Sequence, residues 1–264
     1  MTSHSDQVQK VNKSLRYSVL DGSAFSAMFG LTQNYIAPFA LAMKATTAQI
    51  GLLTSIPSLA TAFSQLSAPK LAEKAGSRKA LVLPTVFLHA LMWLPILLIP
   101  YLMPGQKIWW LIAFMTLSSV FGAMANPAWG SMMADLVPQR IRGRYFAGRG
   151  RIANLVLLFS TFVGGGILQI MQPNLFLGFA ILFGGAIVFR LASFYFLTRM
   201  YEPPPINNGH RGHLMDLVKS LGSSNLGKFS IFVALMSSAP TWPPRSSPSI
   251  CSATFISATC PTSS

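Results

Sequence analysis

Five arginines stand close together between two apolar stretches of the chain, within residues 140–151. A guanidinium group stays charged and offers N–H donors, so its chemistry is pairing with carboxylates. One carboxylate, Asp135, lies just before the run, where the preceding apolar stretch ends. This spacing predicts charge pairs at a cytoplasmic hinge between two membrane spans. The five residues are Arg140, Arg142, Arg144, Arg149 and Arg151.

Other polar residues lie within the apolar stretches, where they are costly and therefore functional candidates. Arg190 is the strongest of these candidates, because a charge inside a membrane needs a partner or a water-filled cavity. The alternative for Arg190 is that its side chain extends along the helix toward the cytoplasmic interface of the membrane, which is called snorkelling. We expect His89 to be a hydrogen-bonded packing residue and Asp21 to be interfacial, with a proton-coupling carboxylate as the alternative for Asp21. The substrate-pathway candidates are Gln33, Asn34, His89, Asn126, Asn154 and Arg190.

The composition argues against several other functions. The six acidic residues are too few and too scattered to form a catalytic cluster, so we expect no enzyme and no catalytic residue. The two cysteines, Cys251 and Cys260, lie near the C-terminus, and their spacing predicts no metal site and no disulfide framework. The net charge of +14 could indicate nucleic acid. Because the basic residues alternate with apolar stretches, we expect no nucleic-acid partner, and we expect no cofactor.

The elements that position these residues are predicted to be membrane-spanning helices. The chain is 52% hydrophobic and 10% charged, whereas a soluble domain carries about 25% charged residues. Since lipid leaves backbone groups no water to bond, the sequence predicts an all-α membrane protein with six transmembrane helices. The spans are expected at 18–43, 48–69, 80–103, 108–134, 150–172 and 175–199.

The loop charges predict the orientation. Of the 20 Lys and Arg residues, 16 lie before span one, in or beside the connections between spans two and three and between spans four and five, or within residues 199–236 after span six. The opposite loops hold only Lys44 and Lys107. By the positive-inside rule, the N-terminus is cytoplasmic in a multi-pass protein of the cell's inner or plasma membrane. The lipid bilayer is therefore its first partner.

Beyond the spans, the chain divides by composition. The tail is rich in Ser, Thr and Pro, which indicates either disorder or a shifted reading frame. The nucleotide sequence of the gene around Trp242 would distinguish these alternatives. The predicted parts are a cytoplasmic N-terminal segment at 1–17, a six-helix bundle at 18–200, a cytoplasmic linker at 201–225, an incomplete seventh span at 226–236 and the tail at 237–264.

Two loops resemble those of a known family. The stretch 69–79 resembles the signature G-x-L-a-D-r-x-G-r-k, found between spans two and three of the major facilitator superfamily. Pro69 and Ser77 depart from that pattern. The stretch from Asp135 through Pro138 resembles the loop between spans four and five of the same superfamily, with Arg142-Gly143-Arg144 following. The positions that match the first signature in type are Leu71, Ala72, Glu73, Lys74, Gly76 and Arg78.

The resemblance implies the N-terminal half of a secondary transporter, with a truncated or frame-shifted C-terminus. Such transporters have twelve or more spans in two six-helix halves. They move a small-molecule solute by alternating access, in some cases coupled to an ion such as a proton. A homodimer could rebuild a twelve-helix pathway. The alternatives are a half-transporter that does not transport by itself and, less in keeping with the composition, a membrane enzyme.

The charged loop residues are also candidates for a conformational latch. An arginine paired with a carboxylate across helices would hold one arrangement of the bundle, and breaking the pair would free another. Gly76 and Gly143 are expected to permit tight turns. The alternative is that these residues only anchor the loops in the cytoplasm. The latch candidates are Glu73, Gly76, Arg78, Asp135, Arg142, Gly143 and Arg144.

Overall fold

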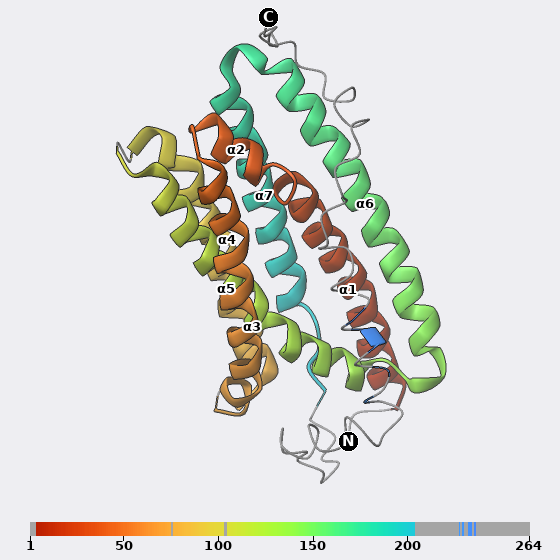
Figure 1. The fold of residues 1–264 in the computed structure, drawn as a ribbon. Coiled ribbons are helices and arrows are strands. Elements are labelled where there is room, and N and C mark those ends of the chain that lie inside the picture. Colours follow the sequence, from red (N-terminus) through yellow and green to blue (C-terminus); the bar gives the residue numbers. More distant parts are fainter. Residues whose placement is uncertain are drawn as a thin grey trace, which may run out of the picture. The chain divides into compact units, whose positions relative to one another are not determined.

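The described part of the chain is helical, which confirms the predicted all-α fold class. A computed structural model describes residues 4–74, 76–102 and 105–203, with single residues between 227 and 235, and it holds no strand within them. Figure 1 shows the arrangement of the helices. They are α1 (His4–Thr32), α2 (Ile36–Ala42), α3 (Thr47–Lys74), α4 (Arg78–Leu102), α5 (Lys107–Leu136), η1 (Gln139–Ile141), α6 (Arg142–Ile170), η2 (Gln172–Asn174) and α7 (Leu175–Thr198).

Four segments of the described chain are long and apolar enough to cross a membrane. They are α4, α5, η1 with α6, and η2 with α7. The helices α1 and α3 have 29 and 28 residues. At about 1.5 Å per residue they exceed the roughly 30 Å of a hydrocarbon core. The six long helices correspond to the six predicted spans. The predicted linker, seventh span and tail fall almost wholly outside the described residues.

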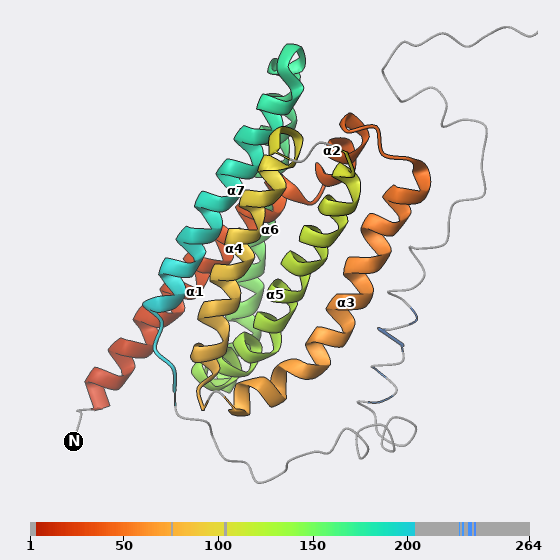
Figure 2. The ribbon, with the colours of Figure 1, turned by 90° about the vertical axis from the view of Figure 1, so that its left-hand side faces the viewer.

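The six long helices pack as a row of neighbours. Helix α6 packs on α1, α1 on α7, α7 on α4, α4 on α5, and α5 on α3. Figure 2 shows α3 on one side of α5 and α7 on the opposite side of α4. This order brings the start of α4 and the end of α5 beside the residues that follow α7. We call this the basic end of the bundle, defined by residues 76–79, 131–142 and 198–203.

The first predicted span, 18–43, is not one helix. Helix α1 begins at His4, so the predicted N-terminal segment forms its first turns, and it ends at Thr32. A turn over 33–35 then leads into α2. Pro38 fits the break, because it stands in the first turn of α2, where a backbone N–H would have no partner within the helix. The hydroxyl of Tyr35 donates a hydrogen bond to the carbonyl of Thr161 on α6, which anchors the turn.

The arginine run is mostly helical, which corrects the expectation of a hinge loop. Only Arg140 lies in the short connection η1, and the other four arginines lie on the first turns of α6. Pro138 stands at the N-cap of η1, and the arginines that follow are residues that favour helix. Gly143 is therefore the second residue of α6 without a positive φ, so the tight turn expected there is wrong. The turn expected at Gly76 is present, with a φ of 69°.

Two apolar clusters fill the bundle. One surrounds Phe39 of α2, whose ring meets Phe179 and Phe183 of α7 at centroid distances of 5.1 and 5.0 Å. The other lies nearer the basic end, around Met133 and Leu197. Polar residues stand between the two clusters along the helices. They are Asp21 on α1, His89 on α4, and Arg190 and Ser193 on α7.

Candidate functional site

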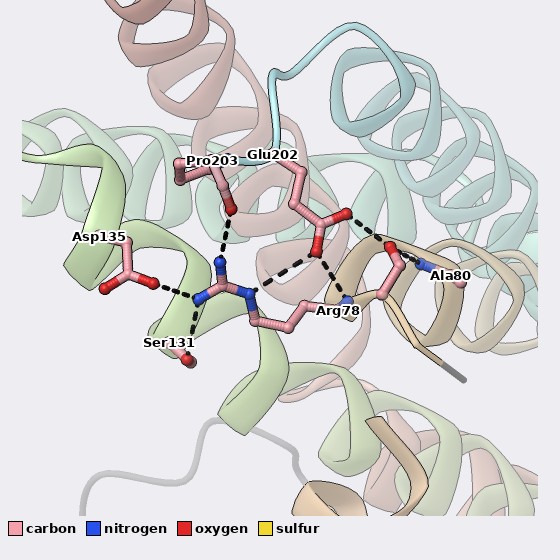
Figure 3. A network of polar contacts seen from close by, with 7 residues as sticks. Arg78, Ala80, Ser131, Asp135, Glu202 and Pro203 are labelled. Atoms are coloured by element: carbon pink, nitrogen blue, oxygen red, sulfur yellow. Dashed lines mark hydrogen bonds and ion pairs between the residues drawn. The ribbon is translucent and has the colours of Figure 1, made fainter. Parts of the chain in front are cut away.

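Arg78, the first residue of α4, is the centre of a polar network at the basic end (Figure 3). Its Nη1 donates to Oδ2 of Asp135 at 2.5 Å and to Oγ of Ser131 at 3.1 Å, both on α5. Its Nη2 donates to the carbonyl of Pro203 at 2.8 Å. Its Nε lies 3.6 Å from Oε1 of Glu202. One guanidinium thus joins α4 to the end of α5 and to the segment that follows α7.

Residues at the start of α4 and just before it reinforce these contacts. The Oγ of Ser77 donates to Oε2 of Glu202 at 2.5 Å and accepts the backbone N–H of Ala80 at 3.2 Å (Figure 3). The backbone N–H of Arg78 donates to Oε1 of Glu202 at 2.8 Å. The Nζ of Lys79 donates to the carbonyls of Thr198 and Met200, each at 2.7 Å. We call this set the Arg78 network: Ser77, Arg78, Lys79, Ser131, Asp135 and Glu202.

Glu202 is held in its charged form by the network. Burial alone would raise its pKa. The hydrogen bonds from Ser77 and from the backbone of Arg78 and Lys79, together with the charge of Arg78, outweigh burial and lower the pKa below its ordinary value of 4.5. Sequence reasoning missed Glu202 because it falls in the predicted linker. The available signal was a carboxylate directly after the last span, in a chain with six acidic residues.

This lowered pKa predicts acid sensitivity. The contribution of Glu202 to stability is fully present above pH 4.5 and is lost as the pH falls through its lower value in the folded protein. Glu202→Gln should therefore cost about 1–2 kcal/mol at pH 7. Thermal unfolding of both proteins between pH 7 and pH 3.5 measures the difference. The two midpoints should converge as the pH falls. A constant gap across that range would contradict the assignment.

The other latch candidates have different positions. Arg142 donates through Nη2 to the carbonyls of Ala134, at 2.5 Å, and Val137, at 3.4 Å, so it caps the end of α5. Arg144 and Gly143 are exposed on α6. The side chain of Glu73 lies outside the described residues. The structure thus brings Arg78 and Asp135 together, with Gly76 in the turn before them, and leaves Arg144 and Gly143 apart.

A second polar cluster is buried within the bundle. Asp21 and Arg190 have only 5% and 4% of their surface exposed. The Oγ of Ser193 donates to Oδ1 of Asp21 at 2.6 Å, and Nη1 of Arg190 donates to Ser193 Oγ at 3.3 Å. The Nη2 of Arg149 lies 3.8 Å from Oδ2 of Asp21. Helices α7 and α6 cover Asp21, so its carboxylate faces the inside of the bundle, and its interfacial depth stays a prediction. Arg190 does not snorkel; its partners are inside the bundle.

Aromatic rings hold both arginines of this cluster. The guanidinium of Arg190 lies 4.8 Å from the ring centroid of Phe25, and that of Arg149 lies 4.5 Å from the centroid of Trp129. Such stacking stabilises a cation and fixes its plane. A cavity of about 150 Å³ opens beside them. Its polar and aromatic lining consists of Asp21, Phe25, Asn126, Trp129, Arg149 and Arg190.

The remaining pathway candidates are spread over the bundle. Gln33 lines a second cavity, of about 400 Å³, with polar residues of α3 such as Thr54 and Ser58. Asn34 and Asn154 are exposed. His89 is buried in contact with Gly122, at which an added Cβ would lie 3.5 Å from the imidazole ring. Its Nδ1 has no hydrogen-bond partner in the described part of the chain, so the packing is present without the hydrogen bond expected there.

The chemistry of these clusters is charge pairing and polar recognition. Within residues 4–74, 76–102 and 105–203, no group of three or more His, Cys, Asp or Glu side chains could hold a metal ion. The buried cluster holds two arginines and one carboxylate, whereas the Arg78 network pairs one arginine and one lysine with two carboxylates. The arrangement can therefore bind anionic groups and hold helix ends together.

Comparison with known proteins identifies the family. A family model described as Major Facilitator Superfamily matches residues 22–262. No significantly similar relative was found among curated proteins, and no solved structure matches significantly. Members of the matched family are integral membrane transporters that act on small solutes, and they are not enzymes. Because the match spans nearly the whole chain and the helices can cross a membrane, this protein belongs to the Major Facilitator Superfamily.

Proposed function

We propose that this protein is a secondary active transporter that moves a small solute by alternating access, and that the Arg78 network latches one of its arrangements. The observation that carries this proposal is the position of Arg78. Its guanidinium touches Asp135 at the end of α5 and both Glu202 and Pro203 after α7. A change in the relative position of these helix ends has to break several charged contacts together.

The burial of the network suits a reversible latch. The side chains of Arg78, Asp135 and Glu202 are 12%, 22% and 21% exposed. Breaking a fully buried ion pair strands desolvated charges, at a cost of about 3–5 kcal/mol. A fully exposed pair contributes about 0–1 kcal/mol. A network between these limits is strong enough to favour one arrangement and weak enough for water to replace its contacts during transport.

The loop charges support a cytoplasmic location for the latch. The residues of the basic end lie in the segments that carry most of the Lys and Arg. The proposal therefore has a cytoplasmic N-terminus, with the Arg78 network closing the bundle on the same side. Coupling to an ion such as a proton is part of the proposal.

A second candidate is a half-transporter that needs another six-helix body. The exposed apolar residues of α3 and α6 favour it. Phe63 on α3 and Phe159 on α6 are each 71% exposed, and α3 and α6 occupy the two ends of the helix row. A second copy of the chain in a homodimer could cover these faces. Cross-linking in the membrane shows whether two copies associate. Transport that occurs only when the copies associate favours this candidate over transport by one chain.

The test is transport by the purified full chain in proteoliposomes. Labelled acetate, alanine and glucose are offered as solutes, with and without a proton gradient. Wild-type protein should accumulate at least one of them. Arg78→Gln should change the transport rate by about tenfold, which corresponds to a change of about 1.4 kcal/mol in the barrier between the two arrangements. Arg140→Gln, the same charge change at an exposed site in η1, should behave as wild type.

Two results would contradict this proposal. Folded wild-type protein that moves none of the three solutes, with or without the gradient, would contradict transport of these solute classes by this chain. Equal transport rates for Arg78→Gln and wild type would contradict the latch while leaving transport in place.

A further inference from the structure

We propose that the cavity beside Arg190 binds one small monovalent anion, either a halide or a small carboxylate. We call it the anion pocket, defined by Asp21, Asn126, Trp129, Arg149 and Arg190. As a statement of the solute or co-ion class, this inference rests on the proposed transport function. As a statement of binding, it stands on the geometry of the pocket alone.

The first observation is an imbalance of charge. The charged residues that line the cavity are Asp21, Arg149 and Arg190. Two guanidinium groups face one carboxylate, which leaves one positive charge inside the bundle. Arginine does not release its proton in proteins, so the imbalance cannot be relieved by deprotonation. An uncompensated charge within a membrane is costly. A monovalent anion is the ligand that neutralises the site.

The second observation is a surplus of hydrogen-bond donors. The Nε of Arg190 and the Nε1 of Trp129 are both buried without a hydrogen-bond partner in the described part of the chain. Both residues line the cavity. Buried donors normally have partners, and a lone pair on a bound group supplies what these two lack. An anion brings lone pairs, whereas a cation would bring none.

The third observation is that the arginines are held in place before any ligand arrives. Ser193 connects Arg190 to Asp21, and Phe25 lies under the Arg190 guanidinium. Arg149 is fixed by Trp129 and by a hydrogen bond of 3.1 Å from its Nε to the carbonyl of Ser18. Groups that are already oriented lose little freedom on binding. The pocket is therefore built for a ligand and is more than a chance meeting of charges.

Size limits the ligand. The cavity of about 150 Å³ has the volume of about five water molecules at about 30 Å³ each. A halide with some water, or a carboxylate of the size of acetate or lactate, fits this space.

The test measures anion binding by the purified full chain without any transport. Protein in Tris-sulfate is titrated with chloride or acetate at constant ionic strength, and the thermal unfolding midpoint is followed. A ligand that binds the folded state raises the midpoint in a saturable way, and the half-maximal concentration reports its affinity. Competition between the two anions shows whether they share one site.

Two variants are expected to change the anion affinity in opposite directions. Arg190→Gln should weaken the apparent affinity by about tenfold or more, because it removes the buried cation. Asp21→Asn should strengthen it several-fold, because it removes the carboxylate that competes for both arginines. Arg199→Gln is the matched control, an exposed arginine near the end of the same α7, and should leave the affinity unchanged. If Arg190→Gln does not fold, Trp129→Phe removes one donor, conserves an aromatic ring and should also weaken binding.

Each outcome decides the question. A saturable shift with chloride alone supports a halide, and a saturable shift with acetate alone supports a carboxylate. Shifts with both anions that are together smaller than the sum of the two show that both share the pocket. No shift beyond that of sulfate, or equal affinities in Arg190→Gln and wild type, would overturn the anion pocket. Anion binding without transport of any solute would leave the pocket in place and count against the transport proposal. Transport of alanine or glucose without anion binding would support the transport proposal and overturn the anion pocket.

Discussion

Replacing Arg78 with glutamine is expected to lower the free energy of unfolding by about 1–3 kcal/mol, between the values for exposed and fully buried ion pairs. The change removes the cation that contacts Asp135, Glu202 and Ser131. Both carboxylates remain, partly buried and without that cation. For a protein of this size, each kcal/mol corresponds to about 2–4 °C in the unfolding midpoint. A thermal unfolding series on the purified protein measures the shift.

A double-mutant cycle assigns this effect to the ion pair. Arg78→Gln and Asp135→Asn should each destabilise the protein, and the double variant should lose clearly less than their sum, because the two changes remove the same contact. Arg140→Gln, in the exposed connection η1, should stay within about 0.5 kcal/mol of wild type. Strict additivity would mean that Arg78 and Asp135 do not stabilise each other.

The second large effect is expected at Gly30, where α1 approaches α6. A Cβ at this position would lie 2.6 Å from the carbonyl oxygen of Leu157 and 2.9 Å from the Cβ of Ser160. The carbonyl is backbone, so one helix has to move away from the other. Overpacking of this kind costs about 1–3 kcal/mol and sometimes more. Gly30→Ala should therefore lower the unfolding midpoint and weaken the packing of α6, the least covered of the four apolar segments that can cross a membrane.

Gly166→Ala is the matched control for this prediction. Gly166 also lies in a long helix of the same pair, and an added Cβ would meet no atom within 4 Å. Because alanine favours helix over glycine, this change should be neutral or stabilise the protein by up to about 1 kcal/mol. Limited proteolysis and thermal unfolding of both variants give the comparison. If Gly30→Ala is as stable as Gly166→Ala, the close contact between α1 and α6 does not exist in the membrane.

The helices and the family follow from local properties of the sequence. A span needs only length and apolar composition, both of which are present within a single stretch of chain. For this reason the six long helices were predictable, as was the loop at Gly76 that resembles the superfamily signature. The residues at which the helices begin and end were less predictable. The first helix ends at Thr32, before Pro38, and α6 begins already at Arg142, a few residues after Pro138.

The sites were predictable only as separate residues. Arg190 and Arg78 stand out in the sequence because a charge in or beside a span is costly, and composition alone shows that. Their partners depend on which helices are neighbours. Asp21 lies 172 residues from Ser193, and Ser77 lies 125 residues from Glu202. The sequence by itself determined the spans, the family and the costly charges. Only the tertiary structure decided which charges meet, because pairing depends on distances between helices that are far apart along the chain.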